Sequence, residues 1–292
     1  MNDVTGPANL ASGKGRTDEN FPVASHLIAA KYRPPILAFY RVARLADDIA
    51  DHPSASAKEK LARLAEIETS LMGQSAASPE AVALRQALAE RALSPLHMLD
   101  LLEAFRRDVS KRRYETWDEL MDYCRYSAAP VGRFVLDVHG EDRAIWPASD
   151  ALCAALQVIN HLQDCKKDYR DLDRVYLPRD VLAALDARVE MLDAEGSHRA
   201  LLAAIRALTW RTQELLRAAR PFAGQIRDFR LAMEVGVIQR LAESLVHRLM
   251  TRDPLSQRMH HRGWEAAGVG ILGVGRTIGE RISPRNLRKA GP

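Results

Sequence analysis

Two clusters of aspartates lie far apart in the chain, and each contains two aspartates that are four residues apart. The first cluster is Asp47-Asp48-Ile49-Ala50-Asp51 and the second is Asp164-Cys165-Lys166-Lys167-Asp168. On a helix, residues four apart lie on one face, and like charges at that spacing repel each other. Mg²⁺ offsets such repulsion, because it takes oxygen ligands and commonly binds one or two carboxylates together with phosphate oxygens. Two clusters of this kind facing one cavity would make a diphosphate site.

The first cluster continues a polar stripe along one helix face. Tyr40, Arg44, Asp47 and Asp51 follow one another at steps of four, three and four residues. The other faces of this segment are mostly apolar, which favours a buried helix, and a buried acidic stripe needs a partner for its charges. The alternative is a solvated stripe in which Arg44 forms a surface ion pair of little energetic value.

The second cluster continues a similar stripe. Gln157, Asn160, Asp164 and Asp168 follow at steps of three, four and four residues, and Gln163 lies at the edge of that face. Amides can bind water and phosphate oxygens, whereas carboxylates can bind a metal. The alternative is again a solvated stripe, neutralised by the two adjacent lysines. Two matching stripes in two apolar helices are much harder to explain as surface.

The elements that must position these stripes are helices. Ala, Leu, Arg and Glu are abundant, β-branched runs are almost absent, and no alternation of period two is long enough for a sheet. The sequence predicts one all-α domain at 20–266, preceded by a disordered segment at 1–19 and followed by a glycine-containing basic tail at 267–292. The predicted helices are 21–33, 35–51, 56–72, 79–93, 95–109, 117–138, 149–171, a short helix from Pro178, 197–220, 221–250 and 253–266.

Composition excludes several classes of protein. The chain has 292 residues, 47% of them apolar, and a net charge of +4, which is too weak to indicate a nucleic-acid partner. Three scattered cysteines favour neither a disulfide framework nor a zinc ribbon and suit a reducing cytoplasm. The glycines at 268, 270 and 273 match G-x-G-x-x-G, but no predicted strand precedes them, so we discount a dinucleotide site. His260 and His261 are adjacent and do not share a helix face, so we expect surface histidines.

Several segments in order resemble the squalene/phytoene synthase family. The two aspartate clusters, with Asn160–Gln163 before the second, are similar to the paired aspartate motifs of that family. The likeness includes Tyr123-Cys124-Arg125-Tyr126-Ser127-Ala128-Ala129-Pro130-Val131-Gly132 and Arg174-Val175-Tyr176-Leu177-Pro178. Residues 19–25 and 160–165 resemble the hopanoid-associated branch of the family, which forms hydroxysqualene.

This resemblance implies an isoprenoid synthase fold, a helical bundle around a central cavity. It implies that presqualene diphosphate loses diphosphate with the help of Mg²⁺, rearranges and takes up water to give hydroxysqualene, without a redox cofactor. By motif match, Asp47, Asp48, Asp51, Asp164 and Asp168 would hold Mg²⁺. The substrate would contact Phe21, Tyr40, Arg44, Gln157, Asn160 and Gln163. The catalytic residues would be Asp47, Asp51, Asp164, Asp168 and Tyr123.

Other interpretations stay open at this point. The chain could act directly on farnesyl diphosphate to form presqualene diphosphate or squalene, or it could be a catalytically silent helical assembly factor. Gln163 stands where many family members have arginine, and residues 127–130 replace a stretch that usually contains glycine. Pro130 should bend its helix. We expect a cytoplasmic protein. Its water-insoluble product would favour peripheral contact with the inner face of the membrane and hand-off to other enzymes of the squalene pathway.

Overall fold

The computed structural model describes residues 27–261, 273 and 277, and this part of the chain contains helices and no strand. An isolated bridge joins Arg113 and Val175. The α-helices are α1 Arg33–Asp51, α2 Ala57–Leu71, α3 Pro79–Ala89, α4 Leu96–Ser110, α5 Trp117–Ser127, α6 Ala129–His139, α7 Trp146–Gln163, α8 Cys165–Leu172, α9 Arg179–Ala184, α10 Arg199–Ala219, α11 Phe222–Gln225 and α12 Phe229–Thr251. Short 3₁₀ segments η1 Ala30–Tyr32, η2 Arg143–Ile145 and η3 Val189–Asp193 connect them. The expected all-α fold is confirmed.

The start of α1 differs from the sequence-based prediction. Pro34 and Pro35 do not stop a preceding helix but lie in the first turn of α1. Proline is tolerated there because the first backbone N–H groups of a helix have no intrahelical acceptor. Within residues 27–32, the short helix predicted at 21–33 is present only as the 3₁₀ turn η1.

Three other predicted helices are divided, and a fourth contains no helix in its continuously described part. The segment 117–138 breaks at Ala128, whose φ of −122° and ψ of −51° separate α5 from α6, and Pro130 follows in the first turn of α6. The segment 149–171 is divided at Asp164, and 221–250 is divided between α11 and α12. Residues 253–261 contain turns and no helix. Periodicity alone misses these breaks, because the apolar pattern continues across each of them.

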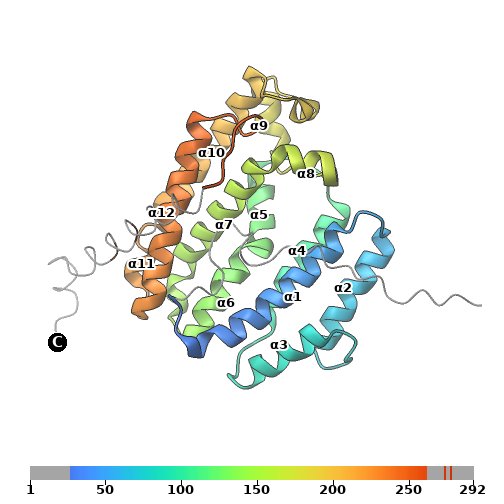
Figure 1. The fold of residues 1–292 in the computed structure, drawn as a ribbon, viewed down its shortest axis with the longest axis vertical. Coiled ribbons are helices and arrows are strands. Elements are labelled where there is room, and N and C mark those ends of the chain that lie inside the picture. The colour runs from blue at the N-terminus through green and yellow to red at the C-terminus, as the bar shows by residue number, and fades with distance from the viewer. Residues whose placement is uncertain (1–26, 262–272, 274–276, 278–292) are drawn as a thin grey trace, which may run out of the picture.

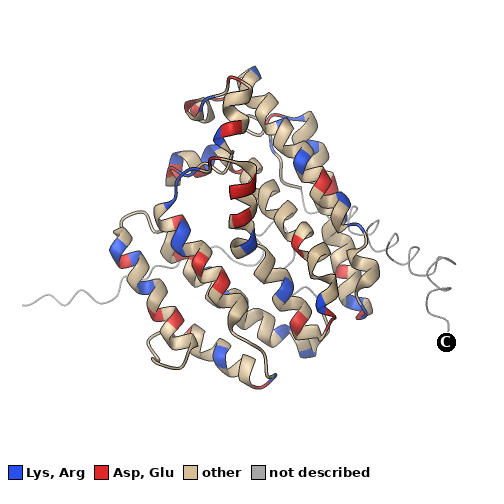
Figure 2. Ribbon diagram, turned by 180° about the vertical axis from the view of Figure 1, so that it is seen from behind, with Lys and Arg blue, Asp and Glu red and all other residues tan. Residues whose placement is uncertain are grey.

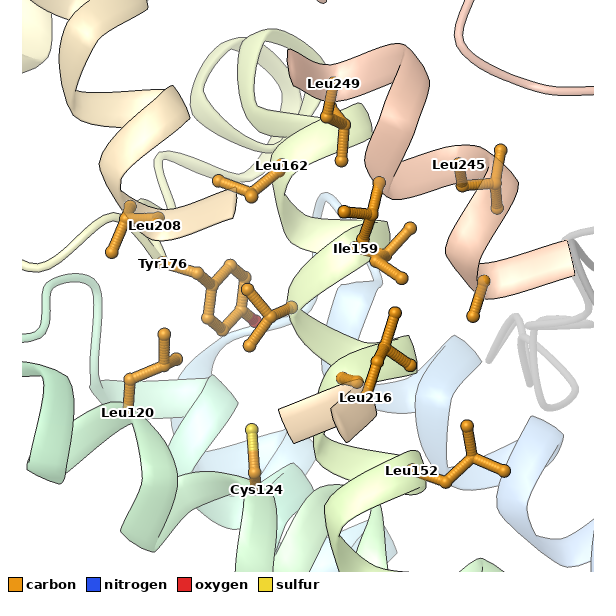
Figure 3. Close-up of a cluster of buried hydrophobic side chains, with 14 of the residues drawn as sticks. Leu120, Cys124, Leu152, Ile159, Leu162, Tyr176, Leu208, Leu216, Leu245 and Leu249 are labelled. Carbon is orange, nitrogen blue, oxygen red and sulfur yellow. The ribbon is translucent and has the colours of Figure 1, made fainter. Parts of the chain in front are cut away.

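Helix α7 lies at the centre of one hydrophobic core (Figure 1). Its apolar side chains Leu152, Ile159 and Leu162 belong to one buried cluster with leucines of α5, α10 and α12 (Figure 3). Ile159 and Leu162 are at most 1% exposed. Burial of each such side chain stabilises the fold by about 1.5–3 kcal/mol, so α7 is firmly held on this side.

A second hydrophobic core joins α1 to its neighbours α2, α3, α4 and α6. Phe39 of α1 stacks on Phe134 of α6 with ring centroids 4.2 Å apart. The buried residues Val42, Ala46 and Ile49 fix the rotation of α1. Since α1 belongs to one core and α7 to the other, the polar stripes of both helices lie at the boundary between the cores.

The outer surface of the bundle carries charges of both signs. Figure 2 shows acidic and basic residues interspersed along the rear side of the molecule, where α4 and α5 lie. Arg107 Nη1 is 2.9 Å from Asp122 Oδ2 across these two helices, and Lys111 pairs with Glu119. Within residues 27–261, no helix combines the length and apolar character needed to cross a bilayer.

Candidate active site

A polar cavity of about 270 Å³ separates the two hydrophobic cores. Its walls come from α1, α4, α5, α7, α8 and the segment that follows α8. Four aspartates from the two sequence clusters line it, with polar, aromatic and a few apolar neighbours. The lining residues are Asp47, Asp51, Leu101, Ala104, Phe105, Asp108, Tyr123, Ser127, Gln157, Asn160, His161, Asp164, Asp168, Leu172, Arg174 and Tyr176. The structure therefore brings both clusters to one cavity.

On the α1 side, Asp47 and Asp51 line the cavity, whereas Asp48 does not. Arg44 contacts both neighbours: Nη1 is 2.8 Å from Asp47 Oδ2 and Nη2 is 2.7 Å from Asp48 Oδ1. The end of α1 is held by Lys60, whose Nζ donates to the carbonyl oxygen of Ala50 at 2.9 Å. Arg44 thus fixes one carboxylate that faces the cavity and one that does not.

Asp47 is the carboxylate whose protonation the site changes most clearly. Burial and, to a smaller extent, the nearby carboxylate of Asp51 raise its pKa to about 7, against the opposing effect of Arg44. The side chain still has 39% of its surface accessible, so it lies in a deep recess that a small ion can enter. A carboxylate with such a pKa gains from any cation placed between it and Asp51.

On the opposite side, Gln157, Asn160, Asp164 and Asp168 all line the cavity, as the spacing predicts. The helix is interrupted at Asp164, but backbone bonds from Asp164 N to Asn160 O (2.9 Å) and from Asp168 N to Asp164 O (2.8 Å) continue the helical path. The four side chains therefore stay on one face across the break. His161 adds an imidazole, and its Nε2 lies 3.0 Å from Gln157 Nε2.

Sequence reasoning assigned no role to Arg174 and Asp108, which join the two walls. Arg174 Nη1 is 2.5 Å from Asp51 Oδ1, Nη2 donates to Ala50 O at 3.1 Å, and Nε donates to Asp108 O at 3.1 Å. Both side chains belong to buried residues. Burial raises the pKa of Asp108, and the charge of Arg174 opposes that rise. Arg174 lies in the Arg174–Pro178 motif, and that motif was the sequence feature that could have indicated its role in the site.

An aromatic group forms one wall of the cavity. Tyr123 Oη donates to Asp108 Oδ2 at 2.8 Å, and Tyr176 Oη donates to Asp108 Oδ1 at 3.0 Å. The ring of Tyr176 stacks on His161 with centroids 3.5 Å apart. Burial raises the pKa of Tyr123 and of Tyr176 well above the ordinary tyrosine value, so both phenols stay protonated. Tyr123 therefore presents a neutral aromatic wall to the cavity.

A second, largely apolar cavity of about 350 Å³ adjoins the polar one. Asn160 lines both cavities, which places it at their junction. Tyr40 of the α1 stripe lines only the apolar cavity. Its other walls are mainly side chains such as Phe39, Phe134 and Leu156. The arrangement is a polar chamber rich in carboxylates beside a chamber suited to hydrocarbon.

The polar cavity is not lined by four of the predicted site residues, namely Tyr40, Arg44, Asp48 and Gln163. Gln163 is buried, does not line either cavity, and has its Nε2 3.4 Å from His260 Nδ1. Phe21 lies outside the described residues, as do nearly all residues of the two predicted terminal segments. His260, expected on the surface, is at the edge of the site, with Nε2 3.7 Å from Asp164 Oδ1. Its adjacency to His261 gave no sign of this contact.

Comparison with known proteins identifies the family of this chain. The family model for squalene/phytoene synthases matches residues 14–265. The chain belongs to the squalene/phytoene synthase family. Among its relatives, hydroxysqualene synthase from Rhodopseudomonas palustris is 57% identical over 88% of this chain and 88% of that protein. Hydroxysqualene synthase from Zymomonas mobilis is 55% identical over 91% of this chain and 90% of that protein.

Solved structures of squalene/phytoene synthase relatives share the fold. The crystal structure of squalene synthase HpnC from Alicyclobacillus acidocaldarius superposes with a TM-score of 0.70 at 32% identity, covering 78% of this chain and 87% of that one. A dehydrosqualene synthase superposes with a TM-score of 0.77 at 18% identity, covering 89% of this chain and 92% of that one. These likenesses support the isoprenoid synthase architecture around the two cavities.

The carboxylates of this squalene/phytoene synthase fit a hard divalent cation. Aspartate oxygens are the donors that such ions prefer. Within the described part of the chain, no three acidic, histidine or cysteine side chains converge on one point. Mg²⁺ commonly takes one or two protein carboxylates and completes its shell with water and phosphate oxygens. The raised pKa of Asp47 points the same way, because burial and the charge of Asp51 outweigh the effect of Arg44 on that carboxylate.

Proposed function

We propose that this chain converts presqualene diphosphate and water to hydroxysqualene and diphosphate. The observation that carries the proposal is the junction of the two cavities at Asn160, where a carboxylate-rich chamber meets an apolar one. A prenyl diphosphate has the same division, with a charged head and a long hydrocarbon body. Relatives that are 49–57% identical and named hydroxysqualene synthase support the choice of substrate and product.

In this proposal the residues of the polar chamber bind the diphosphate through Mg²⁺. Asp47 and Asp51 would hold Mg²⁺ on the α1 side, and Asp164 and Asp168 would hold Mg²⁺ on the opposite side. When bound, Mg²⁺ neutralises the charge that develops on the departing diphosphate. Arg174 keeps Asp51 in place through the ion pair at 2.5 Å. Arg44 holds Asp47 in the same way at 2.8 Å.

The remaining residues control the hydrocarbon and exclude bulk water. The apolar chamber receives the prenyl chains, and its walls keep out water that would otherwise capture the cation early. Tyr123 and Tyr176 place aromatic rings beside the polar chamber, where a ring face attracts positive charge. Because Asp108 accepts from both hydroxyls, at 2.8 and 3.0 Å, the rings are held in fixed orientations.

Product analysis tests this function directly. The full chain is incubated with presqualene diphosphate and Mg²⁺ without a nicotinamide cofactor, and the extract is identified by mass spectrometry. We expect hydroxysqualene and diphosphate, and a parallel reaction with farnesyl diphosphate is expected to yield none. Consumption of farnesyl diphosphate to presqualene diphosphate or squalene would instead assign the chain to an earlier step. Absence of Mg²⁺-dependent diphosphate release from either substrate would favour a catalytically silent protein.

Mg²⁺ binding is expected to weaken as the pH falls below about 7, because the ion must then displace a proton from Asp47. Titration calorimetry of the full chain between pH 6 and pH 8 measures this, and Asp47→Asn provides the comparison. In the metal-free protein the same raised pKa has the opposite consequence. The proton on the Asp47 carboxyl then stabilises the folded state. This contribution to the free energy of unfolding is complete below the unfolded pKa of 3.8 and is lost as the pH rises through about 7. A Mg²⁺ affinity that is equal at pH 6 and pH 8 would contradict the assignment.

A further inference from the structure

The outer face of α10 carries one line of exposed residues, three arginines and a tryptophan. Arg199, Arg206, Trp210 and Arg217 are all exposed and follow one another at steps of seven, four and seven residues. With 3.6 residues per turn, these positions lie within about 40° of one another around the helix axis. The line is about 27 Å long, because a helix rises 1.5 Å per residue. We call these four residues the α10 stripe.

The positive charge of α10 is not balanced within the helix. Its four arginines stand against one acid, Glu214, so α10 has a net charge of +3 in a chain whose net charge is +4. Arg217 pairs with Glu214. Neither Arg199 nor Arg206 forms an ion pair with another described residue. Nearly all of the excess positive charge of the chain is therefore found on one helix, and part of it is free to attract an anionic partner.

Trp210 adds apolar surface to the α10 stripe. It is 54% exposed, although a single exposed apolar side chain is ordinary on a protein surface. Its position is fixed by the opposite face of α10, where Leu201, Leu208 and Leu216 are at most 4% exposed. Figure 3 shows Leu208 and Leu216 within the buried cluster around α7. The helix cannot turn to bury Trp210 without exposing these leucines, so the ring stays at the surface between arginines.

This combination of residues fits the surface of an anionic bilayer. Tryptophan favours the interface between water and lipid, where its amphipathic ring lies at the level of the headgroups. Arginines close to such a surface are attracted by the negative charge of its lipids. The α10 stripe offers both chemistries along one straight line. A nucleic acid is less suited, because the chain as a whole has too small a net charge for a broad phosphate-binding surface.

We propose that the α10 stripe docks this chain on an anionic bilayer, with α10 lying along the headgroups. The choice of a bilayer rests on the proposed function, whose substrate and product carry long hydrocarbon chains that partition into lipid. Arg199, Arg206 and Arg217 contact the lipid phosphates, and the ring of Trp210 enters the headgroup region. Because the attraction is largely electrostatic, binding weakens as the ionic strength rises.

Vesicle flotation of the full chain tests this docking. Wild-type chain is expected to float with vesicles of phosphatidylglycerol and phosphatidylcholine, and much less with phosphatidylcholine alone. Arg199→Gln combined with Arg206→Gln is expected to lower the partition coefficient by about tenfold to thirtyfold, since each cation near the surface contributes about fivefold. Trp210→Ser is expected to lower it by about tenfold, through loss of the interfacial ring.

The matched control is Lys58→Gln combined with Arg63→Gln. Both residues are exposed on α2, which belongs to the other hydrophobic core, and neither forms an ion pair with another described residue. This variant loses the same two charges as the stripe variant, but its partition coefficient is expected to stay near the wild-type value. Equal losses in the two double variants would show an effect of net charge alone and would overturn the inference.

Other outcomes would also overturn the docking. These are a wild-type chain that does not bind anionic vesicles, and unchanged binding in both stripe variants. A stripe substitution that alters the oligomeric state on gel filtration, with vesicle binding intact, would assign the stripe to a protein partner instead. Hydroxysqualene formation from detergent-solubilised presqualene diphosphate is measured on the same preparations and is expected to be equal in all variants. Its absence in the wild-type chain would overturn the proposed function, whereas the vesicle measurements decide the docking independently.

Discussion

Replacing Asp164 by asparagine is expected to lower kcat/KM for presqualene diphosphate by about 10³-fold, the scale of losing a charge-stabilising group in a transition state. Asp164 lines the polar cavity opposite α1, where it is proposed to hold a cation on the leaving diphosphate. Asp47→Asn is expected to have an effect of similar size. Both substitutions preserve side-chain size and relieve carboxylate repulsion, so the fold should persist. A coupled assay of diphosphate release measures the effect, and circular dichroism checks the fold.

Asp48→Asn provides the matched control, because Asp48 is adjacent to Asp47 in the sequence but does not line the cavity. Its contact with the site passes through Arg44 Nη2 at 2.7 Å. We therefore expect a clearly smaller loss of kcat/KM than for Asp47→Asn. Wild-type turnover in Asp164→Asn would contradict the metal assignment. A loss in Asp48→Asn equal to that in Asp47→Asn would show that both aspartates act on the ion.

Arg174→Gln is expected to destabilise the protein by about 3–5 kcal/mol, the usual cost of removing one partner from a buried charged group. The guanidinium is 7% exposed and pairs with Asp51 at 2.5 Å. It also supplies the positive charge that opposes the raised pKa of the buried Asp108. Without it, Asp108 must either stay charged in a low-polarity interior or take up a proton. Urea denaturation of the wild-type chain and the variant measures the difference in the free energy of unfolding.

A double-mutant cycle separates the charge interaction from general loss of packing. Asp108→Asn removes the buried charge that Arg174 compensates, so the combined variant is expected to lose less stability than the sum of the two single changes. A coupling within about 0.5 kcal/mol of zero would indicate independent effects, and it would contradict the role given to Arg174. If Arg174→Gln alone lowers the free energy of unfolding by less than about 1 kcal/mol, the role given to Arg174 is also contradicted, since a loss of that size is typical of an exposed ion pair.

These two predictions distinguish two tasks within one cavity. Asp164 and Asp47 are placed to act on the leaving group, and their replacement should leave stability nearly unaltered. Arg174 and Asp108 lie between the walls, and their replacement should affect both stability and turnover. Asp51 belongs to both groups, since it lines the cavity and pairs with Arg174. A site that must keep like charges close together needs such an internal cation when no metal is bound.

Much of the site could be predicted from local sequence. The four-residue spacing of Asp47 and Asp51, and the matching stripe from Gln157 to Asp168, indicated which side chains share a helix face. Apolar residues on the other faces indicated that those helices are buried, which made a solvated stripe the weaker interpretation. The structure agrees for the carboxylates and amides, because Asp47, Asp51 and the stripe from Gln157 to Asp168 line one cavity, although Tyr40 lines only the apolar one. Even the break at Asp164 leaves the pattern intact, since backbone bonds continue across it.

Other features depended on contacts that sequence patterns do not encode. Asp108 belongs to an ordinary amphipathic helix, and its role follows only from the two tyrosine hydroxyls and the arginine that approach it. The motif match assigned Mg²⁺ to both Asp47 and Asp48, and only the rotation of α1 against its core directs one of them to the cavity. Gln163 was expected to contact substrate, yet it packs toward His260. That pair is separated by 97 residues, beyond the reach of any local pattern.

The sequence by itself determined that this chain is an all-α protein with two acidic helix faces, because helical periodicity and charge repulsion depend on near neighbours along the chain. Its motifs were also sufficient to indicate the squalene/phytoene synthase family. The tertiary structure decided which carboxylates share a cavity, that Asn160 joins a polar chamber to an apolar one, and that Arg174 holds the two walls together. Those properties arise from packing between two hydrophobic cores, and the relative placement of the cores is set by long-range contacts alone.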